Sequence, residues 1–383
     1  MFLPLLLALP WVAAPIVTVL RVLRSRSLDD ESASVTPAAP LVSLVIPARN
    51  EARSIARCVE SLLGSSYPAL EIIVVDDHSA DDTGAIVRGI ASRDARVRVV
   101  TPPPLPDDWF GKQWACAAGA ELARGEIIGF MDADTWSAPD LVPRVVNAIR
   151  ARGSDLLTVA GDQEMGSFWE RIIQPQVFAV MFARFGGTEI VNESRRVANK
   201  IANGQCMFFR REAYDAMGGH AAVKHKVAED LALAQRFFLG NRRVTLILGR
   251  AQLRTRMYHS LRELVAGWGK NIYAGGVDAM PFGAAGQLLY PLLLLIPGLT
   301  GLVPPVLLLL ALAGVLGKGV LVWSSIVTGV NLLWWLAVYA AMGLTPLYAL
   351  LHPLGAAVML YIAATAIARG RRVTWKGRAY RAA

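Results

Sequence analysis

Hydrophobic positions follow two patterns along this 383-residue chain. Between residues 41 and 270, short apolar runs alternate with polar segments, as in a domain folded in water. Four other stretches are long and almost wholly apolar: 2–20, 287–316, 320–342 and 346–368. About 20 apolar residues are enough for a helix to cross a bilayer. The pattern therefore predicts one water-facing domain together with N-terminal and C-terminal transmembrane helices.

The water-facing part predicts strands and helices in alternation. Helix-like segments at 51–63 and 112–123 lie between short β-branched runs that predict strands. The strand candidates are VSLVI (42–46), EIIVVDD (71–77), RVRVV (96–100) and EIIGFMDAD (126–134). Continuous apolar strands joined through helices are typical of a mostly parallel, buried sheet. We therefore predict an α/β, Rossmann-like domain over residues 41–280, with ligands at the carboxyl ends of its strands.

The first apolar stretch predicts a membrane anchor over residues 1–22. A cleavable signal peptide is the alternative, but no basic residue precedes the apolar core, and Pro15 follows the small residues Ala13 and Ala14. Residues 23–40 contain a polar, Pro-containing linker. Because basic residues come after the anchor, its N-terminus is expected outside and the domain in the cytoplasm.

The C-terminal membrane segments are expected over residues 286–368, followed by a basic cytoplasmic tail at 369–383. Three simple crossings would leave this tail outside, against the preference of basic residues for the cytoplasm. Five Gly and Pro residues interrupt the first segment: Pro297, Gly298, Gly301, Pro304 and Pro305. We expect a re-entrant hairpin there followed by two spans, with three crossings as the alternative. Either way, the chain is expected to be a multi-pass protein of the inner (cytoplasmic) membrane.

The formal net charge of +9 lies mainly beside the apolar stretches. Three basic residues follow the first stretch and six follow the last: Arg21, Arg24 and Arg26, then Arg369, Arg371, Arg372, Lys376, Arg378 and Arg381. Such clusters favour anionic lipid headgroups over nucleic acid, and the basic-aromatic tail fits membrane-surface anchoring. Three widely spaced cysteines fit a reducing compartment and offer no metal-ligand spacing: Cys58, Cys116 and Cys206.

A pair of carboxylates, Asp132 and Asp134, closes an apolar strand. Hard oxygen ligands suit Mg²⁺ or Mn²⁺, which can bridge the two phosphates of a nucleotide diphosphate. An Asp-rich turn or helix cap, with Asp140 sharing the capping role, is the structural alternative. The polar residues at other strand ends favour the metal site.

Two further strand ends carry candidates for nucleotide binding. Asp76 and Asp77 follow IIVV and can accept hydrogen bonds from a nucleobase or a ribose hydroxyl. Capping of the next helix explains Asp81 and Asp82, and explains Ser79 as well. The segment Pro47-Ala48-Arg49-Asn50-Glu51 ends the first strand, where Arg49 can face phosphate and Glu51 the base or ribose. A helix start with Asn50 as N-cap accounts for this segment equally well.

Two isolated residues add candidate chemistry. Lys112 at a helix start opposes the helix dipole, so a bound diphosphate is one reason for its presence and simple solvation is the other. Asp230, in Glu229-Asp230 before an apolar helix, is a candidate general base for an acceptor. Capping of that helix is the alternative for Asp230.

The region between the domain and the membrane segments carries Arg254-Thr255-Arg256-Met257-Tyr258 and Gly267-Trp268-Gly269-Lys270-Asn271. Arg, Tyr and Trp next to membrane segments are typical of an interfacial belt. Trp268 and its neighbours are alternatively expected to close over the donor diphosphate and the acceptor.

The order of these motifs resembles the inverting family-2 glycosyltransferases with a GT-A fold. The motifs are P-x-R-N-E, V-D-D-x-S, G-K-x-x-A, D-A-D and E-D, within about residues 41–275. W-F-G-K-Q-W-A-C, G-G-H (218–220), R-M-Y, G-W-G-K-N and V-T-W-K-G-R-A-Y are similar to bacterial carotenoid glycosyltransferases of the diaponeurosporenoate type. Hopanoid-associated glycosyltransferases are a nearby second resemblance.

The resemblance implies a nucleotide-sugar donor, often a UDP-sugar, a divalent metal and a lipid or isoprenoid acceptor. It implies that Asp76 or Asp77 binds the nucleoside, that Asp134 binds the metal and that Asp230 occupies the position of the catalytic base. The Q-x-x-R-W motif of processive synthases is absent around Trp268, which disfavours a polymerase. Transfer to a polyprenyl phosphate is the alternative, with Arg195, Arg196 and Lys200 as candidate phosphate ligands, and an inactive membrane scaffold is the alternative of another class. Neither the particular sugar nor the oligomeric state follows from these motifs.

Overall fold

The computed structural model describes residues 2–36, 38–280, 282–370, 372–375 and 378–381, so Arg371, Lys376 and Gly377 of the predicted tail lie outside it. The chain forms two compact units. The sheet unit consists of Ser25–Glu164, Val191–Met257 and Arg371–Ala383. The helical unit consists of Met1–Arg24, Met165–Ile190 and Tyr258–Gly370.

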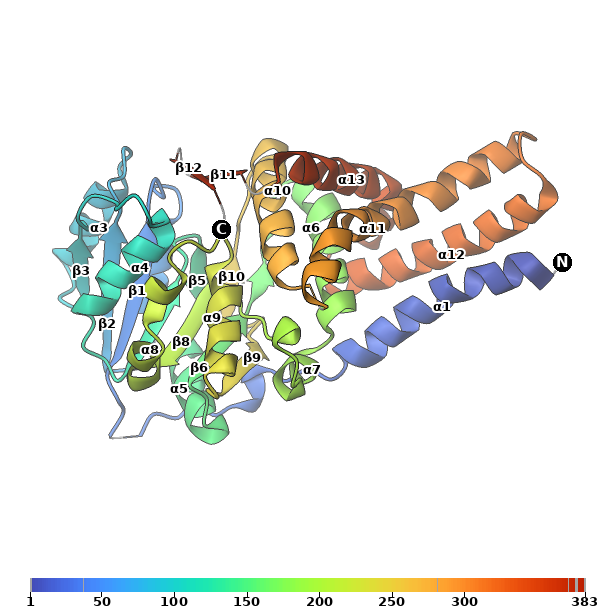
Figure 1. The fold of residues 1–383 in the computed structure, drawn as a ribbon. Helices are drawn as coiled ribbons and strands as arrows, with labels where there is room; N and C mark the ends of the chain where they lie inside the picture. Colours follow the sequence, from blue (N-terminus) through green and yellow to red (C-terminus); the bar gives the residue numbers. More distant parts are fainter. Residues whose placement is uncertain (1, 37, 281, 371, 376–377, 382–383) are drawn as a thin grey trace. The chain divides into compact units, whose positions relative to one another are not determined.

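A seven-stranded sheet in the order β3-β2-β1-β4-β8-β6-β9 organises the sheet unit (Figure 1). Its strands are β1 (Val42–Ala48), β2 (Leu70–Asp76), β3 (Val97–Val100), β4 (Ile127–Met131), β6 (Leu156–Ala160), β8 (Cys206–Arg210) and β9 (Val244–Leu248). Neighbouring strands are parallel except at β8, which is antiparallel to both β4 and β6. The prediction of an α/β domain with a mostly parallel sheet is confirmed.

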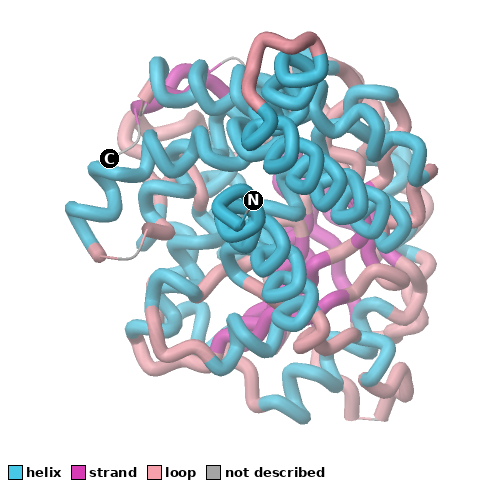
Figure 2. Tube along the Cα trace, turned by 90° about the vertical axis from the view of Figure 1, so that its right-hand side faces the viewer, coloured by secondary structure: helices cyan, strands magenta, loops and turns pink. Residues whose placement is uncertain are grey.

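Both faces of the sheet are covered by helices, because its strands are apolar on both sides. Leu44 and Ile46 of β1 pack in one core with α2 (Ile55–Leu63), α3 (Thr83–Ala91) and α5 (Leu141–Arg152). Val45, between them, packs in the opposite core. This second core takes side chains from α4 (Gly111–Leu122), α8 (Arg211–Ala216) and α9 (Glu229–Leu239). Figure 2 distinguishes the strands, in magenta, from the cyan helices.

The helix expected at 51–63 begins at Ile55, and Asn50 is not its cap. Asn50 has a φ of 55°, in the left-handed region, whereas an N-cap residue is normally extended. The first backbone amides of this segment bond outside the helix, since Glu51 N–H donates to Thr83 Oγ1 (2.7 Å). Residues 51–54 therefore form a turn before α2, in which Glu51 O accepts from Ser54 N–H and Ile55 N–H (both 3.0 Å), and the start of α3 supplies the partner of the Glu51 N–H.

The remaining short elements complete the sheet unit. A second sheet has the order β5-β10-β7. Its strands are β5 (Thr135–Ser137), β7 (Asp162–Gln163) and β10 (Leu253–Thr255). Near the C-terminus, β11 (Arg372–Trp375) and β12 (Arg378–Arg381) form an antiparallel pair. The 3-10 turns of this unit are η1 (Leu28–Asp30), η2 (Val197–Asn199) and η3 (Gly219–Val223).

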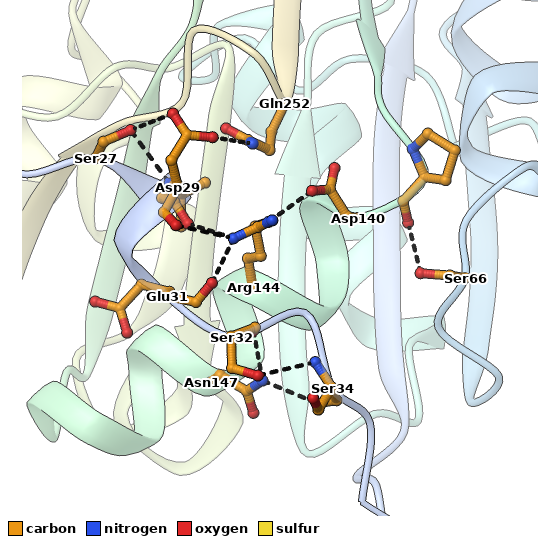
Figure 3. Close-up of polar contacts among 12 residues, drawn as sticks. Ser27, Asp29, Glu31, Ser32, Ser34, Ser66, Asp140, Arg144, Asn147 and Gln252 are labelled. Atoms are coloured by element: carbon orange, nitrogen blue, oxygen red, sulfur yellow. Dashed lines mark hydrogen bonds and ion pairs between the residues drawn. The ribbon is translucent and has the colours of Figure 1, made fainter.

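Polar contacts hold the segment after the first helix against α5 (Figure 3). Arg144 of α5 donates to the carbonyls of Leu28 (3.1 Å) and Glu31 (2.5 Å) and to the Asp140 carboxylate (2.6 Å). Asn147, one turn later, donates to the carbonyls of Ser32 (2.7 Å) and Ser34 (2.9 Å). Gln252 donates to Asp29 (2.7 Å). These contacts give residues 27–34, although polar, a defined path.

The helical unit contains long helices with few charges. Its members are α1 (Phe2–Val22), α6 (Phe168–Phe185), α10 (Leu261–Asp278), α11 (Gly283–Leu312), α12 (Lys318–Ala341), η4 (Pro346–Leu351) and α13 (His352–Arg369), and α7 (Thr188–Glu193) follows α6. Four helical segments in the described part of the chain are long and apolar enough to cross a membrane: Leu3–Val22, Gly283–Leu312, Lys318–Ala341 and Pro346–Arg369. The prediction of apolar helices at both ends of the chain is confirmed.

The expected hairpin within 287–316 is wrong, because α11 continues through all its prolines as one helix of 30 residues. Proline at position i removes the N–H that would bond the carbonyl at i−4. For Pro304 that carbonyl belongs to Thr300, and Asn331 of α12 donates to it (3.1 Å). A neighbouring side chain thus replaces the missing donor, as apolar helices require when they contain proline.

Candidate active site

The predicted strand-end residues meet at one edge of the main sheet. β1 lies between β2 and β4 and is parallel to both, so the carboxyl ends of the three strands are neighbours. Pro47 pairs with Val75, and Ala48 with Asp76, in the last part of β1 and β2. The first residues after β1, β2 and β4 are Arg49, Asp77 and Asp132.

Lys112 joins three of the predicted motifs through one ammonium group. From the first turn of α4, its Nζ contacts Asp132 Oδ1 at 2.7 Å and Glu229 Oε1 at 2.6 Å. Burial acts to lower the pKa of Lys112, but the charges of Asp132 and Glu229 outweigh it and raise this pKa well above its usual value. The same ammonium lowers the pKa of Glu229 against the opposing effect of burial. The alternative of a simply solvated lysine is therefore wrong.

Asp230 lies next to this ion-pair network, at the second position of α9. Its Oδ2 accepts from Gly204 N–H (2.9 Å) and its Oδ1 from Leu231 N–H (2.8 Å). Burial, and then the negative charge of Glu229, raise the pKa of Asp230 to about 6. Asp230 is not the helix cap, because the N-cap residue is Ala228. A carboxylate with this pKa has the basicity that proton abstraction near neutral pH requires.

Asp132 and Asp134 lie in the tight turn between β4 and β5. The carbonyl of Asp132 accepts from Thr135 Oγ1 (2.6 Å), and that of Asp134 accepts from Arg256 N–H (3.2 Å). Among the described residues, no group of three or more His, Cys, Asp or Glu could hold a metal ion. Mg²⁺ needs only one or two protein carboxylates when phosphate and water supply the other ligands, and Asp132 already accepts one cation, the Lys112 ammonium. Two carboxylates therefore satisfy the number of protein ligands that an ion bound together with a diphosphate would need.

Arg49 connects the ends of β1 and β2. Its Nη1 donates to the carbonyls of Asp77 (2.6 Å) and His78 (3.2 Å), while Asp77 N–H donates to Ala48 O (2.8 Å). Asp76 Oδ1 accepts from Ser79 N–H (3.1 Å). Both aspartates are largely buried, and Asp77 is only 2% exposed. The chain at this edge is thus held by both backbone and side-chain contacts.

The remaining predicted residues have simpler surroundings. Glu51 Oε2 accepts from Ser54 Oγ (3.3 Å) just before α2. Trp268 belongs to α10 of the helical unit, where its ring lies 6.0 Å from the rings of both Phe178 and Tyr258. The structure therefore brings the predicted residues of the sheet unit to one edge and places Trp268 in the other unit.

Two charged residues at this edge were not among the predicted site residues. The sequence predicts Asp230 as the functional residue of the Glu229-Asp230 motif, whereas Lys112 pairs with Glu229. Arg378, from the first position of β12, forms an ion pair with Asp77. The tail motif containing Arg378 was visible in the sequence, but no local pattern links it to a residue 301 positions earlier.

Comparisons with known proteins agree with the predicted enzyme class. Residues 43–218 match the model of glycosyl transferase family 2. A 4,4'-diaponeurosporenoate glycosyltransferase from Staphylococcus aureus (strain MRSA252) is 27% identical over 248 residues. The match spans 63% of this chain and 63% of that relative's length.

Solved structures of glycosyltransferases also align with the chain. The mannosyltransferase PcManGT from Pyrobaculum calidifontis, in complex with GDP-Man and Mn²⁺, is 18% identical, with a TM-score of 0.48 over 96% of this chain and 97% of that chain. Glucosyl-3-phosphoglycerate synthase from Mycobacterium tuberculosis, in complex with Mn²⁺, UDP and glucosyl-3-phosphoglycerate, is 22% identical. Its TM-score is 0.42, over 63% of this chain and 80% of that chain.

Proposed function

Because residues 43–218 match the model of glycosyl transferase family 2, we propose that this chain is an inverting glycosyltransferase of the GT-A class. It moves a sugar from a nucleotide-diphosphate donor, with UDP-sugar favoured, to a lipid acceptor such as a carotenoid or another isoprenoid. The observation that carries this proposal is the network in which Lys112 joins Asp132 to Glu229, beside Asp230. It brings a cation for the leaving diphosphate next to a base for the acceptor.

The donor half of the site consists of the ends of β1, β2 and β4. Asp132 and Asp134 would hold Mg²⁺ or Mn²⁺, which when bound supplies positive charge to the departing diphosphate. Lys112 adds a fixed ammonium to the same charge. Pro47, Arg49, Glu51, Asp76 and Asp77 form the edge proposed to face the nucleoside and its phosphates.

The acceptor half of the proposed reaction depends on Asp230. The acceptor oxygen forms a bond to the anomeric carbon while the bond from that carbon to the diphosphate oxygen breaks. Asp230 takes the proton from the attacking hydroxyl, and the diphosphate leaves with the bonding electron pair. A carboxylate acceptor has no proton to lose, and Asp230 then orients it.

The lipid acceptor is supported by the helices and by a relative. Within the described residues, four helices are long and apolar enough to cross a membrane, and the Staphylococcus relative is named a 4,4'-diaponeurosporenoate glycosyltransferase. We place the chain in the inner membrane with the sheet unit on the cytoplasmic side, where basic residues such as Arg24 and Arg26 follow the first span. Trp268 of α10 is proposed, from its place in the sequence beside the membrane segments, as a residue that closes over the donor diphosphate and the acceptor.

The polyprenyl-phosphate alternative loses one of its three candidate cations. Arg195 and Arg196 are exposed, whereas Lys200 is only 3% exposed and donates to the carbonyls of Val191 (2.9 Å) and Asn192 (2.7 Å). Burial also lowers the pKa of this lysine. An inactive scaffold is disfavoured because every carboxylate that the reaction needs is present at one edge of the sheet.

The test is a transfer assay on the full chain in lipid nanodiscs. UDP- and GDP-sugars are supplied with Mg²⁺ or Mn²⁺ and a total bacterial lipid extract. We expect labelled sugar in a neutral or carotenoid lipid, lost in Asp230→Asn and retained in Asp215→Asn, whose carboxylate lies at the surface of α8. Label in an acid-labile polyprenyl phosphate would establish the alternative, and nucleotide binding without any lipid product would overturn the proposed acceptor class.

A further inference from the structure

The C-terminal hairpin reaches the same sheet edge as the proposed donor site. β11 and β12 pair in the register Arg372 with Arg381 and Trp375 with Arg378. Arg378 thus stands at the start of the second strand. Its guanidinium contacts Asp77 through two nitrogens, Nη1 to Oδ2 at 2.5 Å and Nη2 to Oδ1 at 3.3 Å.

This ion pair is largely removed from water. The side chain of Asp77 is 2% exposed and that of Arg378 is 21% exposed. Two-point contact between a guanidinium and a carboxylate fixes the orientation of both groups. The backbone of Asp77 is also held, by Ala48 and by Arg49. The tail therefore fixes the carboxylate of a residue whose main chain already has a fixed position.

The effect of the Arg378–Asp77 ion pair on a bound nucleotide depends on the other charges at this edge. Asp76, Asp77, Asp132 and Glu229 are acidic, and Lys112 is already shared between two of them. A nucleoside diphosphate would bring further negative charge. If Arg378 left on binding, Asp77 would remain buried and unpaired near a polyanion, and a neutral nucleobase N–H would not offset that charge. Retention of the ion pair is the favoured arrangement.

Resting on the proposed function, we propose that the C-terminal hairpin is part of the donor site, with Arg378 as a positioning residue for nucleoside-diphosphate binding. Arg378 holds the Asp77 carboxylate in one orientation and offsets its charge towards the diphosphate. The tail then has a role in the donor site besides contact with anionic lipid. A residue near the C-terminus, Arg378, meets a residue of the first strands, Asp77, at one sheet edge.

The test is calorimetric titration of the full chain in nanodiscs with UDP and with GDP, in the presence of Mg²⁺ or Mn²⁺. We expect Arg378→Ala to weaken binding of the preferred nucleotide about tenfold or more, and Arg378→Lys, which keeps the charge, to recover part of the loss. The matched control is Arg93→Ala, since Arg93 is an exposed residue paired only loosely with Glu60 (3.9 Å). In turnover, Arg378→Ala should raise KM for the donor more than it lowers kcat. Its melting temperature should fall, because Asp77 is left buried without its partner, so binding and turnover are compared at a temperature where every variant is folded.

A double-mutant cycle shows whether Arg378 acts through Asp77. In the Asp77→Asn background, Arg378→Ala should weaken nucleotide binding much less than it does in the wild-type chain, because the negative charge that Arg378 offsets is gone. Unchanged binding in Arg378→Ala, or tighter binding as expected of a competing tail, would overturn the inference. Failure of the wild-type chain to bind either nucleotide would instead count against the proposed function.

Discussion

Lys112 is the residue on which the proposed site depends most. Its ammonium links the end of β4 to the start of α9, through Asp132 and Glu229. We expect Lys112→Gln to lower kcat/KM about 100-fold or more, because it removes a fixed positive charge from the leaving group. It should also cost about 3 kcal/mol or more of stability, since Glu229 is left buried without its partner.

Steady-state kinetics and thermal unfolding would measure both effects. Lys224→Gln is the matched control, because Lys224 pairs with Asp108 at the surface, where an ion pair contributes about 1 kcal/mol or less. Activity in Lys112→Gln within a few-fold of wild type would contradict the role given to this lysine.

Asp230 makes the pH dependence of the reaction predictable. Its pKa is raised to about 6 by burial and by the charge of Glu229, and only the deprotonated form can accept a proton. For a hydroxyl acceptor, kcat/KM should therefore rise with pH up to about 6 and level off above it. In Glu229→Gln, the loss of the neighbouring negative charge should move this limb to lower pH. A pH–rate profile of both proteins checks this, and a shift to higher pH would contradict the assignment.

Most of the candidate site was predictable at the scale of single residues because parallel strands end at a common edge. That rule applies to Asp77 and Asp132 without knowledge of their contacts. It does not apply to Arg378, whose partner lies 301 positions earlier. The periodicity of a sequence reports neighbours within one element, and a contact of this kind depends on how the whole unit folds.

At the scale of elements, α5 shows how a polar segment acquires a fixed path. Arg144 donates to three carbonyls of residues 28–31 and to Asp140. Arg150 of the same helix is exposed, and its side chain donates only to the more distant Thr36 (3.3 Å) and Ala38 (3.4 Å) among the described residues. We expect Arg144→Ala to destabilise the protein by about 2–3 kcal/mol, through several lost hydrogen bonds to a charged group. Arg150→Ala should cost less than about 0.5 kcal/mol. Equal effects in thermal unfolding would contradict this account.

The prolines of α11 show why the membrane segments were harder to predict. A proline-rich stretch suggests a break, but the carbonyl that Pro304 leaves without a donor is bonded by Asn331 of another helix. The sequence of α11 alone holds no information about that partner. We expect Asn331→Leu to cost about 1 kcal/mol, in the range of hydrogen bonds between membrane helices.

Pro304→Ala supplies the control for this prediction. Alanine restores a backbone N–H that can bond the Thr300 carbonyl within α11, so Asn331→Leu should cost little in that background. Unfolding in mild detergent would measure the four proteins of the cycle. The same cost in both backgrounds would show that Asn331 acts in some other way.

At the scale of the whole molecule, the chain divides its chemistry between two solvents. Carboxylates and the ammonium of Lys112 lie at one edge of the sheet unit. Large exposed apolar side chains, such as Leu288 (80% exposed) and Leu309 (68%), lie on the candidate spans. Exposed apolar surface of this extent is unusual for a soluble protein and is expected where lipid covers it. The composition of the chain already implied the candidate spans, because each of them is continuous in sequence, whereas it did not place residues 165–190 with them.

An enzyme with this division should draw its acceptor from the bilayer, and its rate should then depend on the acceptor's concentration within the membrane. With a fixed amount of a subsaturating isoprenoid acceptor, doubling the inert lipid should reduce the initial transfer rate to about half, because a strongly apolar acceptor stays in the bilayer and is diluted there. Increasing the water volume should leave the rate per enzyme unchanged, when the amounts of lipid, protein and acceptor and the concentration of donor are all held constant. These rates can be measured in proteoliposomes with labelled nucleotide-sugar. A rate that follows the bulk acceptor concentration and ignores added lipid would mean that the acceptor comes from water, and the apolar helices would then serve attachment alone.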